Sequence, residues 1–381
     1  MQHSTKINNI SHNESSIIIE WKDGEKSTFH YLWLRDNCPS DIHPTARERL
    51  FNIITVSENI KPKSYKVNEE GKLKIIWNEG DHTSYFETNW LRKNCYTIKN
   101  KKKHISPYKL WDNSLNNIFK EISFECEEIM MKDECLIKWL EILLQYGISI
   151  VKNAPTEKKS GLKLLNRISH IRETFFGTPF EVINIPEPNN TAYTARGLEN
   201  HTDLPYFEIP PGYQFLHCLV NNAEGGMSSI VDGFKVVEYL EKNEKKTYEI
   251  LKKIDVNFIN NDYTQNTVRS INSPLISLTK NGDYKEIRFN ISQTGTINCE
   301  PELMEEFYKA YRRFAELIHS EKFTVNFKLN KGDVFSFDNR RVVHGRTEFN
   351  PNSGHRHLQG YYMDRDEIIG RLNYLKKIEF Y

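Results

Sequence analysis

The chain has 381 residues, more than one hydrophobic core usually holds, which favours a large domain joined to a smaller one. Its hydrophobic content of 38% and charged content of 27% are typical of a soluble globular enzyme. A net charge of +1 argues against the strong field that proteins use to bind nucleic acid or anionic membranes. Residues 1–13 lack the apolar core of a signal peptide, and no apolar run approaches the roughly 20 residues of a membrane helix. We therefore expect a cytoplasmic protein that binds neither nucleic acid nor membrane.

The N-terminal part of the chain has short apolar runs separated by turn residues. Strands are predicted over residues 16–21, 27–34, 50–56, 73–77 and 83–86. They indicate a small β-rich domain over residues 10–97. The lysine-rich run 99–104 follows, and we expect a basic linker over residues 98–112, with a nuclear or nucleic-acid patch as the alternative.

The remaining residues, 113–381, combine a few helical segments with many strands. Helices are predicted over residues 114–145, 160–175, 236–254 and 301–320. Most of the other segments after residue 177 have the pattern of strands, with no regular alternation of strand and helix. This favours a mainly β domain with flanking helices, a double-stranded β-helix or jelly roll, over a doubly wound sheet.

Residues 201–203 read His-Thr-Asp, which is the only His-x-Asp in the chain. On an extended backbone His201 and Asp203 point to the same side and can bind one metal ion. Two protein ligands leave a divalent metal under-coordinated, as in an incomplete 2-His-1-carboxylate triad of the non-haem Fe(II) oxygenases. His344 is the candidate third ligand, because a closed barrel can place a late strand beside an early one. The alternative for His344 is a buried histidine bonded to the backbone.

Arg356 follows His344 after the turn-forming segment 350–354. A returning strand would bring its guanidinium toward the metal, where it can bind a carboxylate through two hydrogen bonds. 2-Oxoglutarate has a distal carboxylate that needs such an anchor. Arg346 is the nearest competitor, and a surface ion pair is the alternative role for Arg356.

Several motifs are specific in combination and span nearly the whole chain. They are residues 33–39, 201–206, 211–219, 225–228, 231–234, 337–346 and 356–360. Together they resemble the γ-butyrobetaine dioxygenase family, which belongs to the taurine-dioxygenase-like Fe(II)/2-oxoglutarate enzymes. The resemblance implies a small-molecule hydroxylase that forms a homo-oligomer, most simply a dimer.

The resemblance also implies roles for individual residues. His201, Asp203 and His344 would hold Fe(II), and Arg356 with Ser228 would bind the distal carboxylate of 2-oxoglutarate. O2 would be the second cosubstrate and ascorbate a reductant. The expected reaction is hydroxylation of an unactivated C–H bond, first of all γ-butyrobetaine to L-carnitine in carnitine biosynthesis. The alternatives are hydroxylation of another amine or amino acid such as trimethyllysine, and a non-catalytic metal-binding or ligand-sensing barrel.

The family substrate carries a trimethylammonium group, which aromatic faces attract. Tyr193 and Tyr362 match two positions of the family's aromatic cage. Phe176 and Phe180 fall at the other two, where the best-known members have Tyr and Trp, and core packing is their alternative role. Asn190 matches a position that binds the substrate carboxylate.

In the N-terminal domain the resemblance implies a structural zinc held by three cysteines and a histidine. Cys38 matches the first ligand and His82 the last. Ser40 stands where a cysteine is expected, His43 lies near another ligand position, and Asp41 is a further candidate. Since structural zinc prefers four protein ligands, a buried Cys38 without zinc is the alternative.

Overall fold

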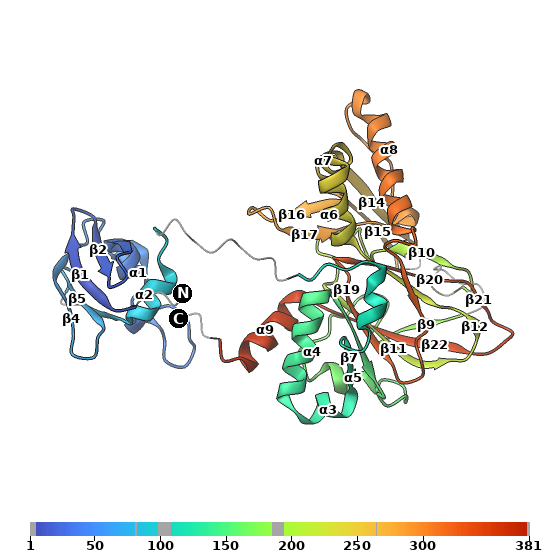
Figure 1. Cartoon of the computed structure of the whole chain (residues 1–381), viewed down its shortest axis with the longest axis horizontal. Coiled ribbons are helices and arrows are strands. Elements are labelled where there is room, and N and C mark those ends of the chain that lie inside the picture. The colour runs from blue at the N-terminus through green and yellow to red at the C-terminus, as the bar shows by residue number, and fades with distance from the viewer. Residues whose placement is uncertain (1–4, 81, 98–107, 185–193, 264, 379–381) are drawn as a thin grey trace. The chain divides into compact units, whose positions relative to one another are not determined.

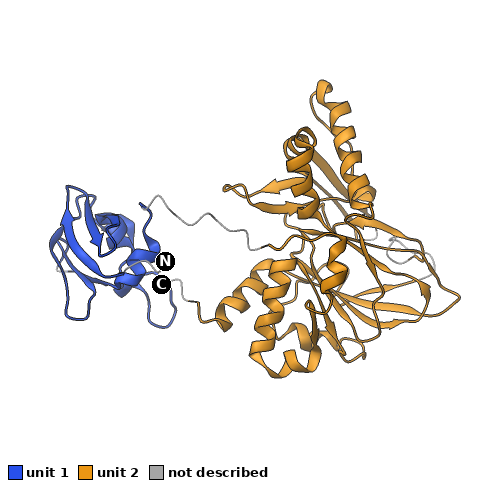
Figure 2. Cartoon of the chain, in the orientation of Figure 1, with its two compact units in different colours: residues 1–105, 380–381 blue, residues 106–379 orange. Residues whose placement is uncertain are grey.

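The computed structural model describes residues 5–80, 82–97, 108–184, 194–263 and 265–378. The chain divides into two compact units, residues 1–105 with 380–381 and residues 106–379 (Figure 2). The greater part of the expected linker lies outside the described residues. Residues 108–112, also expected as linker, belong to the larger unit, because Trp111 is buried there. Its backbone N–H donates to Asp232 (3.1 Å) and its indole N–H to the Tyr146 carbonyl (2.7 Å).

The smaller unit consists of two three-stranded antiparallel sheets and short helices around a core of buried aromatic residues. Its elements are β1 (Ile7–His12), β2 (Ser16–Trp21), β3 (Lys26–His30), α1 (Tyr31–Asp36), β4 (Pro62–Val67), β5 (Leu73–Trp77), β6 (Thr83–Phe86) and α2 (Thr88–Asn94). The prediction of a strand over 50–56 was wrong. The run is apolar, but Ile53 and Ile54 are exposed, and the Asn52 side chain accepts from the Ile54 N–H to form a short 3-10 turn instead. The strand predicted over 27–34 ends at His30, where α1 begins.

The larger unit is built from two facing sheets (Figure 1). The first has the order β7 (Ser123–Glu125), β8 (Ile148–Lys152), β19 (Val334–Asp338), β11 (Tyr213–Asn221), β22 (Arg356–Met363) and β9 (Phe180–Ile183). The second has the order β10 (Leu198–His201), β20 (Val342–Arg346), β13 (Ser228–Asp232) and β18 (Val325–Phe327). Apolar side chains from both sheets form one buried cluster between them. The predicted mainly β jelly roll is confirmed.

Helices cover the outer faces of both sheets. The larger sheet packs on α3 (Cys126–Met131), α4 (Asp133–Tyr146), α5 (Gly161–Leu165) and α9 (Arg365–Leu375), and the smaller on α6 (Gly233–Asn243), α7 (Lys245–Lys253) and α8 (Pro301–Ile318). The helix predicted over 160–175 ends at Leu165, and further along the chain Arg172 pairs as an isolated bridge with Tyr362. The helix predicted over 114–145 is interrupted by β7, and the one over 236–254 by Glu244.

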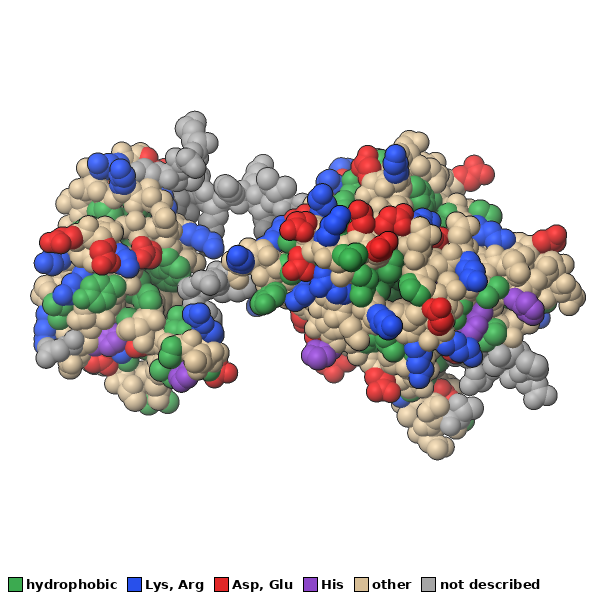
Figure 3. Space-filling view, turned by 90° about the horizontal axis from the view of Figure 1, so that it is seen from below, with side chains coloured by type: hydrophobic (Ala, Val, Ile, Leu, Met, Phe, Trp, Pro, Cys, Tyr) green, Lys and Arg blue, Asp and Glu red, His purple; other side chains and the backbone are tan. Residues whose placement is uncertain are grey.

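The remaining elements of the larger unit are short. They are the hairpin β14 (Asp255–Asp262) and β15 (Thr267–Pro274), the hairpin β16 (Ile276–Leu278) and β17 (Tyr284–Ile287), the pair β12 (Glu224–Gly225) and β21 (Phe349–Asn350), and the 3-10 turns η3 (Asn113–Ile118) and η5 (Ile291–Gln293). Residues of the β14–β15 hairpin pack against Leu204, Tyr206 and Tyr362. Within the described ranges no helix is both long and apolar enough to cross a membrane. On the face in Figure 3, acidic and basic side chains are interspersed on each unit.

Candidate active site

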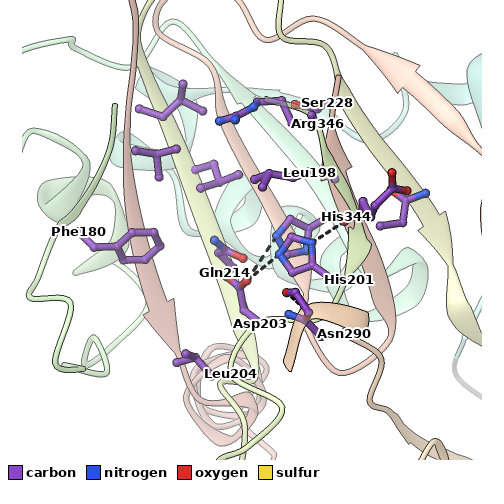
Figure 4. A pocket seen from close by; sticks show the side chains of 18 of the residues that line it. Phe180, Leu198, His201, Asp203, Leu204, Gln214, Ser228, Asn290, His344 and Arg346 are labelled. Carbon is purple, nitrogen blue, oxygen red and sulfur yellow. Dashed lines mark hydrogen bonds and ion pairs between the residues drawn. The ribbon is translucent and has the colours of Figure 1, made fainter. Parts of the chain in front are cut away.

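His201, Asp203 and His344 come together between the two sheets. His201 on β10 stands opposite His344 on β20 in the strand register. The Oδ1 atom of Asp203 lies 3.2 Å from His201 Nε2 and 3.8 Å from His344 Nε2. Figure 4 shows the three side chains pointing toward one another inside a pocket. Their ligand atoms all lie within 4.8 Å of one another, so one cation can contact all three.

The backbone of the His-Thr-Asp segment is held from two sides. The Asn339 side chain accepts from the Asp203 N–H (2.7 Å) and donates to the Asp203 carbonyl (3.0 Å). On the other side, the Thr202 N–H donates to the Phe289 carbonyl (2.7 Å), and the Phe289 N–H donates to the Thr202 hydroxyl (3.0 Å). Sequence reasoning gave Asn339 no role, although it lies within one of the recognised motifs.

The tautomer of His201 follows from its neighbours. Its Nδ1 lies 2.7 Å from the Glu199 carbonyl, which can only accept a hydrogen bond, so Nδ1 carries the proton. In the neutral ring, Nε2 therefore directs its lone pair at the Asp203 carboxylate. Two electron-rich atoms at this distance need positive charge between them, which either a second ring proton or a metal ion supplies. The donor set of this pocket thus fits a divalent cation.

The pKa values of the three side chains reflect the same need for positive charge beside the Asp203 carboxylate. Burial opposes charge on both His201 and Asp203. Their mutual hydrogen bond nevertheless raises the pKa of His201. The neighbouring His344, this hydrogen bond and the Tyr362 hydroxyl hold the pKa of Asp203 well below its usual range. Burial, followed by the nearby His201, lowers the pKa of His344 to about 3. At neutral pH, His344 is thus a neutral imidazole and Asp203 a carboxylate, the forms that bind metals.

One end of the cavity is lined by buried cationic side chains. Burial lowers the pKa of Arg356 to about 10, and burial with the charge of Arg356 lowers that of Arg346 to about 9. Arg346 donates to the carbonyls of Thr194 (2.8 Å) and Arg196 (2.7 Å). Among the described residues, Arg356 Nε has no hydrogen-bond partner, although it is buried. With Ser228, these two arginines make an end suited to an anion (Figure 4).

The cavity has a volume of about 370 Å³, and another of its walls is aromatic. The rings of Phe180 and Tyr362 stack with centroids 4.8 Å apart, and Phe176 lies 6.3 Å from Phe180. All three line the cavity, and the two phenylalanines also pack in a hydrophobic cluster with Tyr362. Asn190 and Tyr193, the other predicted substrate residues, lie outside the described residues.

Two amide side chains also line the cavity, Gln214, to which sequence reasoning gave no role, and Asn290, which the resemblance places in a segment similar to that of Asn190. Gln214 is buried on β11, and its Oε1 accepts no hydrogen bond from any described residue. Asn290 is oriented by neighbours in η5, since it accepts from the Ser292 hydroxyl (2.8 Å) and donates to Gln293 (3.0 Å). Gln214 lies in a recognised motif at a strand position facing inward, which was the available signal.

Comparison with known proteins assigns the chain to a family. Residues 112–362 match the model of the taurine catabolism dioxygenase TauD, TfdA family, which covers more than half of the chain. The chain belongs to the TauD, TfdA family. Residues 8–113 match the model of the gamma-butyrobetaine hydroxylase-like N-terminal domain. This TauD-family chain is therefore a dioxygenase, as the resemblance predicted.

Relatives place it more narrowly within the TauD family. It is 36% identical to gamma-butyrobetaine dioxygenase of Pseudomonas sp. (strain AK-1), over 95% of this chain and 94% of that protein. It is 32% identical to mitochondrial trimethyllysine dioxygenase of Homo sapiens, over 90% of this chain and 81% of that protein. The predicted membership of the γ-butyrobetaine dioxygenase family is confirmed. The crystal structure of AAD-2 in complex with Mn(II) and N-oxalylglycine shares the fold, with a TM-score of 0.50 and 13% identity, over 61% of this chain and 90% of that one.

The N-terminal unit of this TauD-family chain holds a second cluster of candidate ligands, Cys38, Asp41 and His82. The prediction placed His43 in this cluster, but His43 Nδ1 instead accepts from the Ala46 N–H (3.1 Å). Asp41 takes its place, yet its carboxylate already forms an ion pair with Arg35. Among the described residues the cluster therefore offers three ligands, one of them in an ion pair, which is short of the four-ligand set of structural zinc.

Proposed function

We propose that this protein is an Fe(II)- and 2-oxoglutarate-dependent hydroxylase of a small trimethylammonium substrate, with γ-butyrobetaine converted to L-carnitine. One observation carries the proposal. A single cavity has His201, Asp203 and His344 at its centre, buried Arg356 at one end and an aromatic wall on another side. This order of charge suits a metal, an anionic cosubstrate and a cationic substrate held together.

Each group of side chains has a task in this proposal. His201, Asp203 and His344 would hold Fe(II), which, together with 2-oxoglutarate and O2, supplies the oxidising power to insert oxygen into a C–H bond. Arg356 binds the distal carboxylate through its guanidinium, and Ser228 donates a hydroxyl beside it. Gly226, with φ +64°, lies against the Arg356 side chain, and its missing Cβ lets the arginine pass over the backbone.

The aromatic wall orients the substrate. Phe176, Phe180 and Tyr362 present ring faces and edges to the cavity, and a trimethylammonium group gains about 0.5–2 kcal/mol from such contacts. The group cannot donate hydrogen bonds, so it is not penalised for leaving water as an ammonium would be. The wall also excludes water from the C–H bond that reacts.

Turnover tests the proposal directly. The purified chain, incubated with Fe(II), ascorbate, 2-oxoglutarate and γ-butyrobetaine, should yield L-carnitine and succinate in equal amounts. His344→Ala should abolish both products, whereas His170→Ala, at an exposed histidine of the same unit, should not. Succinate formation that survives in His344→Ala would refute the metal site. A wild-type chain without any succinate formation would favour a non-catalytic barrel.

Trimethyllysine is the second candidate substrate. The 32% identity to a trimethyllysine dioxygenase supports it, as does the presence of phenylalanine at two cage positions. Both substrates carry the trimethylammonium group, so the aromatic wall alone does not separate them. Side-by-side kcat/KM values, scored by succinate release, decide which substrate the pocket prefers.

Metal analysis tests the remaining parts of the proposal. We expect one equivalent of iron per chain, lost in Asp203→Ala. A second equivalent, of zinc and lost in Cys38→Ser, would assign a structural metal to the Cys38, Asp41 and His82 cluster. Omitting ascorbate from the assay tests its role as a reductant, since it should shorten the period of linear turnover without changing the initial rate.

A further inference from the structure

Tyr362 joins the aromatic wall to the metal-binding cluster. Its hydroxyl donates a hydrogen bond of 2.7 Å to Oδ2 of Asp203, while Oδ1 of the same carboxylate faces both histidines. Its ring stacks on Phe180 and lines the cavity. One side chain thus contacts the carboxylate that would hold the metal and the surface that would hold the substrate.

We propose that Tyr362 is a positioning residue that keeps Asp203 a one-oxygen metal ligand, an inference that rests on the proposed function. The hydrogen bond occupies Oδ2, so only Oδ1 is directed at the metal position. A carboxylate without this partner can rotate, so Oδ1 is no longer held toward the metal position. Loss of such an orienting hydrogen bond weakens metal binding.

The surroundings of Tyr362 make it suited to this role, because neither end of the hydrogen bond can move easily. β22 lies between β11 and β9 in the larger sheet, and Tyr362 stands opposite Gln214 in the register. The residue is 3% exposed, and the stacked Phe180 ring restricts its rotation. At the other end, Asn339 holds the backbone of Asp203 on both its N–H and its carbonyl.

Hydroxyl and ring can be tested separately. Tyr362→Phe removes the hydroxyl and keeps the ring, whereas Tyr362→Leu removes both. We expect Tyr362→Phe to weaken Mn²⁺ binding by about tenfold, measured by calorimetry on the full chain without substrate. Its KM for the trimethylammonium substrate should stay within about twofold of the wild type, because the ring face remains. Tyr362→Leu should weaken Mn²⁺ binding to a similar extent and also raise that KM.

Tyr206→Phe is the matched control. Tyr206 is also buried and packs in the same cluster as Tyr362, but its hydroxyl has no hydrogen-bond partner among the described residues and does not line the cavity. Its Mn²⁺ affinity should equal that of the wild type. A general loss of packing would instead affect both tyrosine variants alike, and would overturn the inference.

The outcomes separate this inference from the proposed function. If the wild type binds Mn²⁺, Asp203→Ala does not, and Tyr362→Phe binds as tightly as the wild type, the positioning role is wrong and the metal site stands. If the wild type binds no Mn²⁺, the proposed function itself fails. Weakened binding in Tyr362→Phe, with unchanged substrate KM and an unchanged Tyr206→Phe control, supports the inference.

Discussion

Gly360 lies directly beneath the Phe180 ring, and its lack of a side chain shapes the aromatic wall. A methyl group at Gly360 would place a carbon 2.6 Å from Cε1 of Phe180, with Cζ and Cε2 nearer still. Unstrained carbon atoms approach to about 3.5–4.0 Å. In Gly360→Ala the ring must therefore move by roughly 1 Å or more, and Tyr362 blocks one side of it. Because Phe180 lines the cavity, this displacement changes the shape of the aromatic wall.

The size of the effect follows from this displacement. Overpacking of a filled core costs about 1–3 kcal/mol, so the free energy of unfolding should fall by that amount. A cation that loses its contact with one ring face loses about 0.5–2 kcal/mol, which corresponds to a rise in substrate KM of roughly 2- to 30-fold. The KM for 2-oxoglutarate should not change, since Arg356 lies elsewhere in the cavity.

Urea unfolding measures the free energy of unfolding, and succinate-release kinetics measure the substrate KM. Two further variants serve as controls. Gly370→Ala makes the same substitution on α9, where the structure places no described atom within 4 Å of the new methyl group. Its free energy of unfolding should rise by about 0.5–1 kcal/mol, because alanine is the better helix former. In Gly360→Ala/Phe180→Leu the clash is relieved, so the double variant should be less destabilised than the sum of the single variants. Additive losses, or a Gly360→Ala variant with wild-type stability and KM, would refute the reasoning.

Three other substitutions test separate contacts. Asn339→Ala removes the clamp on the Asp203 backbone and should lower Mn²⁺ affinity about tenfold, as calorimetry would show. Arg341→Met leaves the Asp232 carboxylate without its cationic partner, at a place where both side chains are 0% exposed. The free energy of unfolding should therefore fall by about 3–5 kcal/mol, and an unchanged thermal midpoint would contradict this. Arg356→Leu should raise the KM for 2-oxoglutarate roughly 10- to 150-fold, the equivalent of a charged hydrogen bond worth about 1.5–3 kcal/mol, and leave the substrate KM unchanged.

Local geometry was enough to identify one part of the site from the sequence. His201 and Asp203 were recognisable because side chains two apart share one side of an extended strand. His344 and Arg356 could be proposed only by assuming that a closed barrel brings late strands beside early ones. The register that pairs His201 with His344 depends on long-range strand pairing, which spacing along the chain does not encode.

The contacts that the sequence could not predict depend on three-dimensional packing. The Tyr362 hydroxyl reaches Asp203, and the Phe180 ring lies over Gly360, only because β22 borders both β11 and β9. The wrong secondary-structure predictions have a similar cause. The helix predicted over 160–175 ends at Leu165, and its expected last turns are replaced by a segment in which Arg172 pairs with Tyr362 on β22, since tertiary contacts override local preference.

The order of charge along the cavity explains why the two organic ligands cannot exchange places. Arg346 and Arg356 repel a trimethylammonium group from their end, and burial strengthens this repulsion because water screens it poorly. The rings of Phe180 and Tyr362 offer a carboxylate no hydrogen bond, apart from the Tyr362 hydroxyl that Asp203 already occupies. A sulfonate or carboxylate placed on that wall would be desolvated without compensation. The electrostatics therefore favour a cationic group at the aromatic wall and an anionic group at the arginine end, independently of sequence identity.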